Sequence, residues 1–112
     1  MTDAELCREV AVKVMGWRYD KRNPNKPIVP NASDPNWAHF EDFELSWPDA
    51  GRVIERMWER GYYLVMDNNH GIFTASFLSY EDSTVVSSAD DESGPRAVFE
   101  AALKAVEARG GQ

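Results

Sequence analysis

YYLVMDNNHGIFTASFLSYEDSTVVSSA, residues 62 to 89, decides the fold of this 112-residue chain because it predicts three short β-strands in succession. The segments 62–67, 72–79 and 84–89 are rich in aromatic or β-branched side chains, and turn residues bound each of them. The connection DNNHG places its asparagines and its glycine where a tight turn needs residues that tolerate positive φ. We therefore expect an antiparallel meander.

Both faces of the predicted sheet carry apolar side chains. Leu64 and Met66 share one face, whereas Tyr63 and Val65 share the other. A sheet with two apolar faces requires cover on both sides. We therefore expect an α+β fold in the form of a three-layer α-sheet-α sandwich, in which helices cover both faces of an antiparallel sheet of three to four strands.

The segment TDAELCREVAVKVMGW, residues 2–17, predicts the first helix. Thr2 and Glu5 have the spacing of a capping box, which satisfies free amides at a helix start. The apolar side chains that repeat at helical spacing along one stripe are Leu6, Cys7, Val10, Ala11 and Val14. Because Cys7 belongs to this stripe, we interpret it as a buried small hydrophobe. A nucleophilic thiolate needs an exposed cationic setting instead.

Two further helices frame the strands. One begins at Ser46 as its N-cap and closes at Gly61, and the other begins at Ser93 and ends at Gly110. The resulting order is α-loop-α-β-β-β-α. A chain of this length is expected to bury one core, so residues 1–112 are predicted to form a single domain.

A long irregular stretch, residues 17–44, separates the first two helices. It holds four of the six prolines and shows neither a helical nor a strand period, yet it is rich in aromatic side chains. Such connections inside a compact domain are either disordered or functional. We expect its ends to be ordered and to pack through Trp17 and Phe43. Segments 17–19 and 27–29 are candidates for an extra hairpin at the sheet edge.

Charge is distributed unevenly along the chain. The net charge is -7, with a sum of +2 over residues 1–26 and of -9 over residues 27–112. Affinity for duplex nucleic acid rests on an excess of Lys and Arg, so we expect no duplex partner, although mimicry of DNA is an open alternative. The acidic excess repels anionic membranes, and no apolar run is long enough to span one. A single cysteine and a start without a secretory pattern favour the cytoplasm.

The sequence contains no recognisable catalytic or metal-binding motif. His39 and His70 are far apart and belong to no spaced metal signature, and no glycine-rich loop is suited to cradling phosphate. The serines lack the glycine-flanked elbow of a nucleophile. The acidic residues between 81 and 92 lack the regular oxygen spacing of a calcium loop. We therefore expect a protein without enzymatic activity, cofactor or metal.

A row of arginines marks the second predicted helix. Arg52, Arg56 and Arg60 are four residues apart, and Glu55 and Glu59 form the neighbouring row. Two interpretations are open: a solvated, salt-bridged face, or a ladder of guanidinium groups for phosphate or carboxylate. If the ladder binds a ligand, charge reversal at Arg56 should abolish binding and leave the thermal midpoint within a few degrees.

The candidate ligand site combines this row with the long stretch and with the turn at 68–70. Aromatic rings are suited to stacking on a base and basic side chains to phosphate groups. The alternative is that Trp17 and Trp37 plug the ends of the sheet. We expect a small phosphorylated ligand, or an acidic partner surface, against some of the residues Arg18, Tyr19, Arg22, Trp37, Arg52, Arg56, Arg60, Asn69 and His70.

Four segments together resemble a known family. ELCREVAVKVMGW at 5–17, WPDAGRVIERMWERGYYL at 47–64, FTASF at 73–77 and GPRAVFEAALKAVEA at 94–108 cover about half of the residues. In this order and at these separations they resemble the phage ABA-sandwich domain proteins, small products of phages and prophages. The resemblance implies an α-sheet-α fold and a phage or prophage protein in the host bacterial cytoplasm, and it offers no enzymatic motif to transfer.

Three functional hypotheses follow. The first is a non-catalytic binding protein, acting as a counter-defence sponge for a nucleotide immune signal or as an inhibitor of a host protein. The second is a self-assembling structural or accessory phage protein, and the third is a hydrolase. Because a three-stranded sheet has two open edges, we also expect a homo-oligomer, with segment 84–89 or whichever strand is outermost as the contact.

Overall fold

The computed structural model describes residues 1–30 and 38–110 of the chain. It is an α+β structure in which the described residues form three helices and two three-stranded antiparallel sheets. The elements are α1 (Asp3–Lys13), β1 (Arg18–Asp20), β2 (Asn23–Pro30), β3 (Ala38–Phe40), α2 (Trp47–Glu59), β4 (Tyr62–Asn69), β5 (Ile72–Ser79), β6 (Val85–Asp91) and α3 (Gly94–Gly110). None of these helices is long and apolar enough to cross a bilayer.

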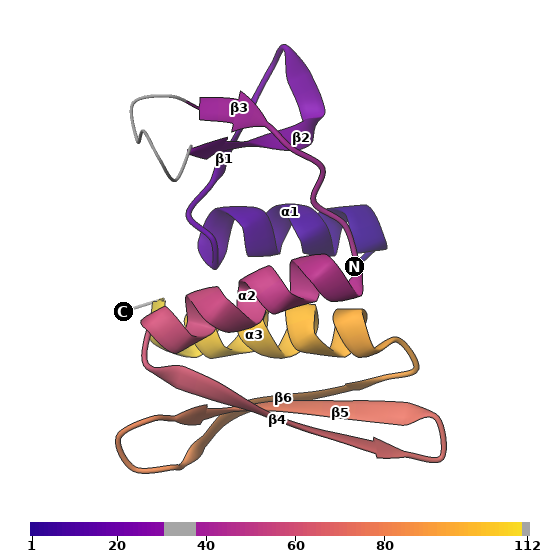
Figure 1. Cartoon of the computed structure of the whole chain (residues 1–112), viewed down its shortest axis with the longest axis vertical. Coiled ribbons are helices and arrows are strands. Elements are labelled where there is room, and N and C mark those ends of the chain that lie inside the picture. Colours follow the sequence, from indigo (N-terminus) through magenta and orange to yellow (C-terminus); the bar gives the residue numbers. More distant parts are fainter. Residues whose placement is uncertain (31–37, 111–112) are drawn as a thin grey trace.

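The layers differ from the predicted sandwich. The large sheet β4-β5-β6 lies at one end of the long axis, the small sheet β1-β2-β3 at the other, and the three helices between them (Figure 1). All three helices therefore lie on the same side of the large sheet, and the prediction of helices on both of its faces is wrong. The apolar alternation that begins at Tyr63 and Val65 continues with Asp67 and Asn69, so the opposite face is only partly apolar.

The large sheet is the predicted meander. β4 pairs with β5 from Tyr62↔Ser79 to Asn69↔Ile72, and β5 pairs with β6 from Phe73↔Asp91 to Leu78↔Val85. The first turn consists of His70 at φ 54° and Gly71 at φ 84°. Positive φ thus falls on His70 and Gly71, whereas both asparagines belong to the strand.

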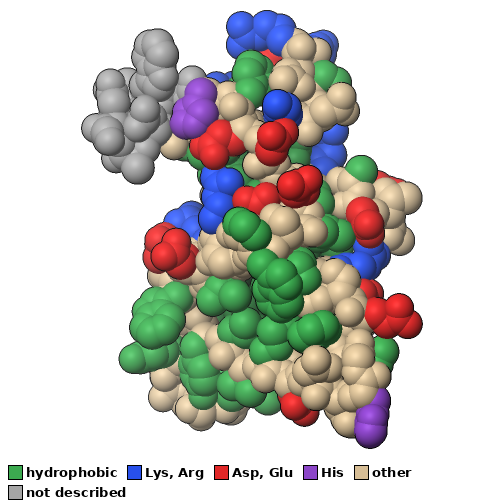
Figure 2. Space-filling model, turned by 45° about the vertical axis from the view of Figure 1, so that its right-hand side comes forward, with side chains coloured by type: hydrophobic (Ala, Val, Ile, Leu, Met, Phe, Trp, Pro, Cys, Tyr) green, Lys and Arg blue, Asp and Glu red, His purple; other side chains and the backbone are tan. Residues whose placement is uncertain are grey.

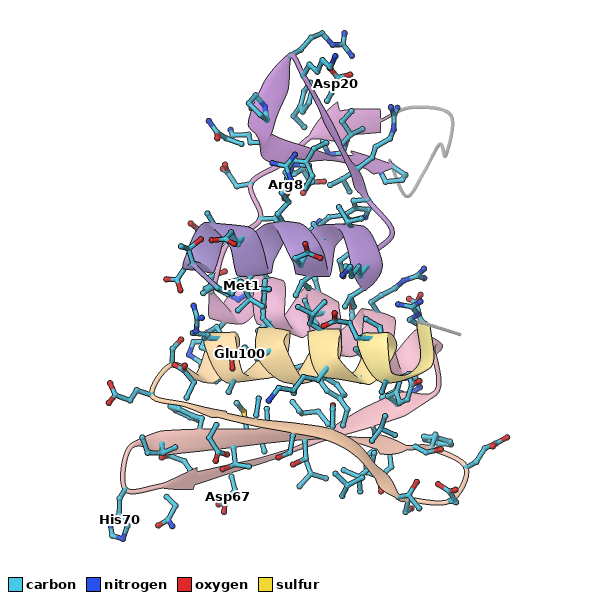
Figure 3. The ribbon with its side chains drawn as sticks, turned by 180° about the vertical axis from the view of Figure 1, so that it is seen from behind. Met1, Arg8, Asp20, Asp67, His70 and Glu100 are labelled. Carbon is cyan, nitrogen blue, oxygen red and sulfur yellow. The ribbon has the colours of Figure 1, made fainter. Side chains whose placement is uncertain are left out.

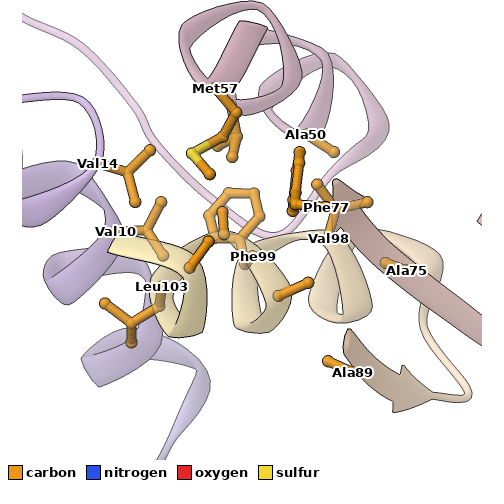
Figure 4. Close-up of a cluster of buried hydrophobic side chains, with 14 of the residues drawn as sticks. Val10, Val14, Ala50, Met57, Ala75, Phe77, Ala89, Val98, Phe99 and Leu103 are labelled. Carbon is orange, nitrogen blue, oxygen red and sulfur yellow. The ribbon is translucent and has the colours of Figure 1, made fainter. Parts of the chain in front are cut away.

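Helix α3 forms the centre of the core. It packs against α1, α2, β5 and β6, and its buried alanines let these neighbours approach closely. Phe99 is fully buried and lies among side chains from the other helices, including Val10, Val14 and Met57 (Figure 4). Burying a side chain of this size stabilises the fold by roughly 1.5–3 kcal/mol.

The helix ends follow the local sequence signals. Thr2 Oγ1 accepts from the Glu5 amide at 3.1 Å, and Glu5 Oε1 accepts from the Thr2 amide at 3.3 Å, which completes the predicted capping box. Ser46 Oγ accepts from the Asp49 amide at 3.3 Å at the start of α2. Gly61, at φ 93°, follows the end of α2 as predicted.

The long stretch between α1 and α2 is anchored at both ends, as predicted. Phe43 is 8% exposed and stacks on Phe99 with ring centroids 5.2 Å apart. Trp17 meets Phe43 edge to face at 5.1 Å. The expected hairpin exists, because β1 pairs with β2 through Arg18↔Ile28, but it joins β3 in a separate small sheet and does not extend the large one.

Candidate functional site

Arg52, the first arginine of the predicted ladder, is engaged within the chain. Its Nη1 lies 3.2 Å from Asp49 Oδ1, and its Nη2 lies 3.4 Å from Glu41 Oε1. The guanidinium group also lies over the Trp17 ring, 4.7 Å from the ring centroid. Arg52 therefore connects α2 to both ends of the 17–44 stretch.

Arg56 and Arg60 bind the end of α1. Arg56 donates from Nε to the Val14 carbonyl at 3.3 Å and from Nη1 to Glu59 Oε2 at 3.0 Å. Arg60 donates from Nη1 to the carbonyls of Lys13 and Val14 at 3.0 and 3.2 Å. The last carbonyls of a helix have no partner within the helix and carry its negative dipole end, so guanidinium groups stabilise them. This geometry gives the row a role in joining α1 to α2.

The other predicted ligand residues in the described part of the chain fall into two groups at opposite ends of the molecule, one at the β1–β2 hairpin and one at the β4–β5 turn (Figure 3). Arg18 is exposed on β1, and Arg22 forms an ion pair with Asp20 at 3.0 Å. This contact lowers the pKa of the Asp20 carboxyl. Asn69 and His70 lie at the turn of the large sheet, at the opposite end of the molecule from Asp20 (Figure 3). Trp37, which also belongs to the predicted set, lies outside the described residues.

A hollow of about 450 Å³ lies between α1 and the small sheet. Its wall includes Arg8 and Cys7 from α1, Tyr19, Asn25 from β2 and Glu44 from the segment that leads into α2. Of these residues, sequence reasoning selected only Tyr19 as a ligand contact. The available signal was the basic excess of residues 1–26, to which Arg8 contributes, but the fold alone brings α1 against the small sheet.

Arg8 is fixed in this wall by two contacts. Its guanidinium carbon lies 4.4 Å from the centroid of the Tyr19 ring, and its Nη1 donates to the Pro24 carbonyl at 3.4 Å. Figure 3 shows the side chain between α1 and the small sheet. Within residues 1–30 and 38–110, no carboxylate forms an ion pair with Arg8. These contacts hold the charge of Arg8 in place, and no described carboxylate neutralises it by direct contact.

The side of the hollow next to Cys7 has the opposite electrostatic character. Burial, together with the smaller effect of the negative charges of Asp3, Asp49 and Glu44, raises the pKa of the Cys7 thiol from the ordinary 9.0 to about 11. The thiol is therefore protonated at neutral pH, which suits the predicted structural role of Cys7. The hollow thus combines a fixed cation with nearby carboxylates, an arrangement that suits a ligand with an anionic group and N–H donors.

The structure of residues 1–30 and 38–110 shows no metal-binding cluster. Among the described residues, no three His, Cys, Asp or Glu side chains gather closely enough to hold an ion.

No protein-family model, curated protein or solved structure matches the chain. The resemblance to phage ABA-sandwich proteins therefore stays a prediction from the sequence.

Proposed function

We propose that this chain is a small non-catalytic binding protein of phage or prophage origin that holds a small phosphorylated ligand in the hollow between α1 and the small sheet. The observation that carries the proposal is Arg8. Its guanidinium group is supported by the Tyr19 ring, lines a hollow and has no ion-pair partner among the described residues. Guanidinium groups bind phosphate through paired hydrogen bonds, which gives both affinity and orientation.

A nucleotide is the phosphorylated ligand that suits the remaining wall. The volume of about 450 Å³ falls within the roughly 300–1,000 Å³ of typical small-molecule sites. With phosphate on Arg8, the Glu44 carboxylate is suited to accept from the N–H groups of a base, and the Asn25 amide both donates and accepts. Sequestration of a nucleotide immune signal in the host cytoplasm requires such binding and no chemistry.

The wall also favours binding without turnover. Its thiol has a raised pKa, and neither histidine lines the hollow. A nucleophile or general base must be poised near neutral pH and positioned at the reacting atom. Inhibition of a host protein, self-assembly and hydrolysis stay alternative proposals.

Nucleotide binding to the purified full chain tests the proposal directly. Isothermal titration with nucleoside monophosphates, cyclic mononucleotides and cyclic dinucleotides should identify at least one ligand, and mass spectrometry should recover it unchanged. Replacing Arg8 by Gln should weaken binding by about 10- to 100-fold, because a hydrogen bond to a charged group contributes roughly 1.5–3 kcal/mol.

Arg22→Gln is the matched control. Arg22 is also a predicted ligand residue, but its guanidinium pairs with Asp20 and does not line the hollow. We expect its affinity to equal that of the original chain. Failure of every nucleotide to bind, equal losses in the two variants, or chemical change of the ligand would each contradict the proposal.

Self-association through a sheet edge stays a separate proposal. The order β4-β5-β6 leaves β4 and β6 as the two edge strands, and β6 contains most of the predicted contact segment 84–89. Sedimentation velocity at micromolar concentration distinguishes a monomer from an oligomer. A monomer at all concentrations would contradict this proposal.

A further inference from the structure

Among residues 1–30 and 38–110, no helix or strand covers the face of the large sheet that points away from the helices, here called the outer face (Figure 1). Ala75 and Phe77 of β5 are fully buried against the helices, so the alternate residues Thr74, Ser76 and Leu78 belong to the outer face. The pairing of the strands places three rows across this face. These rows are Tyr63-Leu78-Val85, Val65-Ser76-Ser88 and Asp67-Thr74-Asp90.

The first row forms the apolar end of the outer face. Tyr63 meets Tyr80 at a centroid distance of 6.2 Å, and Tyr80 in turn meets Trp58 of α2 at 5.9 Å. At this end of the sheet Trp58 is 61% exposed, Tyr80 63% and Val85 64%. An adjoining hollow of about 380 Å³ is lined by Trp58, Glu59, Arg60, Gly61, Ser79, Tyr80 and Glu81. The Arg60 guanidinium donates to the carbonyls of Lys13 and Val14, whereas neither Glu81 nor Tyr80 has such a partner among the described residues of α1. Exposed aromatic side chains beside a hollow are typical anchors for a protein partner.

The charged side chains of the large sheet and its turns are all acidic. Residues 61–95 contain no Lys or Arg and the six carboxylates Asp67, Glu81, Asp82, Asp90, Asp91 and Glu92. Of these, Asp91 forms an ion pair with Arg96 of α3. Figure 2 shows Lys and Arg side chains over the small sheet and the helices, and hydrophobic side chains over the part that holds α2 and the large sheet. Glu81 lies beside the aromatic hollow, and Asp67 and Asp90 lie at the other end of the face.

From this arrangement we infer that the outer face docks a basic segment of another protein. An aliphatic or aromatic side chain of the partner occupies the hollow between Trp58 and Tyr80, and its Lys or Arg side chains face Glu81 and the Asp67-Asp90 row. Complementary charge speeds encounter and selects the partner, while the aromatic anchors supply affinity. This surface is distinct from the hollow that contains Arg8, so the inference stands independently of the proposed nucleotide site.

A second copy of the chain is the less suitable occupant. If two outer faces stacked with their ends aligned, the Asp67-Asp90 rows would meet each other; if the ends were opposed, these carboxylates would meet the Tyr63-Leu78-Val85 row. Both arrangements bury carboxylates without a basic partner, because the sheet provides none.

Selection of short random peptides on the immobilised full chain tests the inference. We expect enrichment of peptides that combine Lys or Arg with an aliphatic or aromatic anchor. An enriched peptide, synthesised and titrated by calorimetry, should bind Tyr80→Ser at least about tenfold more weakly than the original chain. Glu81→Gln should weaken binding and reduce its salt dependence. No enrichment, or enrichment of acidic peptides, would overturn the inference.

Val12→Ser is the matched control, because Val12 is an exposed hydrophobic residue on α1 and lies outside the outer face. Its affinity for the peptide should not change, and circular dichroism should show that all variants keep their folded structure. Equal binding by Tyr80→Ser and the original chain would overturn the inference. So would a dimer in sedimentation velocity that Tyr80→Ser dissociates, because a second copy would then cover the face.

Discussion

Arg56 of α2 donates from Nε to the carbonyl oxygen of Val14 at 3.3 Å, a bond between residues 42 positions apart in the chain. Arg60, one helical turn further on, donates to the same carbonyl at 3.2 Å. Two guanidinium groups therefore meet at the negative end of α1. The same row of arginines that suggested a ligand site in the sequence fastens two helices together in the fold.

Arg56→Gln should lower the free energy of unfolding by about 1–2 kcal/mol, since the change removes a charge-assisted bond from a half-exposed side chain. The thermal midpoint should then fall by several degrees, which is more than we expect for the replacement of an arginine that only contacts solvent. Urea unfolding followed by circular dichroism measures the change. Glu55→Gln on the same helix is the control and should leave stability within about 0.5 kcal/mol. Equal stability of the two variants would argue against the role in joining the helices.

Phe43→Ala should destabilise the protein by about 3–5 kcal/mol, because its buried ring contacts both Phe99 and Trp17. Hydrogen exchange in β1 and β2 should accelerate at the same time, since this ring connects the small sheet to the core. Phe40→Ala is the control, because Phe40 is 37% exposed on β3. This substitution should lower the free energy of unfolding much less than Phe43→Ala does. Similar losses in both variants would show that Phe43 is not the anchor.

Gly94→Ala should displace the Trp47 ring, because a Cβ at position 94 would overlap its outer edge. The substitution should cost about 1–3 kcal/mol and disturb the edge-to-face contact between Trp47 and Phe73. A double-mutant cycle with Trp47→Ala separates this overlap from the preference of helices for alanine. In the Trp47→Ala background we expect Gly94→Ala to be neutral or stabilising. An equal cost in both backgrounds would refute the explanation.

The pH dependence of stability should carry the signature of Cys7. Its folded-state pKa, raised by burial to about 11 from 9.0, favours the protonated thiol in the folded state. This contribution is fully present below pH 9 and is lost as the pH rises toward 11. The stability difference between the original chain and Cys7→Ala should shrink over that interval, in urea titrations at successive pH values. A constant difference would show that the thiol titrates alike in the folded and unfolded chains.

The sequence was most informative where one signal acts over a few residues. The Thr2 capping box, the Ser46 N-cap and Gly61 mark helix ends through bonds to nearby backbone groups, and the structure confirms them. The Trp17 and Phe43 anchors were also predictable, because two large rings at the ends of one irregular stretch require burial.

Properties that depend on distant segments were predicted less well. The cover of the large sheet depends on where α1 packs, and α1 contacts α3 instead of the second face. Arg8 becomes a candidate ligand contact only when the hairpin brings Tyr19 and Pro24 against α1. The turn at 68–70, which was expected to share a ligand site with the arginines, contains His70 and lies at the far end of the large sheet (Figure 3). No local period encodes these distances.

The central position of α3 has a consequence for synthesis on the ribosome. Its buried stripe, from Ala97 to Val106, is the common surface against which α1, α2 and the large sheet pack. A nascent chain that has emerged only as far as residue 93 therefore exposes the apolar sides of all these elements at once. We expect chaperones to bind the exposed apolar surface of such a nascent chain. We expect cooperative folding to begin only when the residues of α3 have left the exit tunnel.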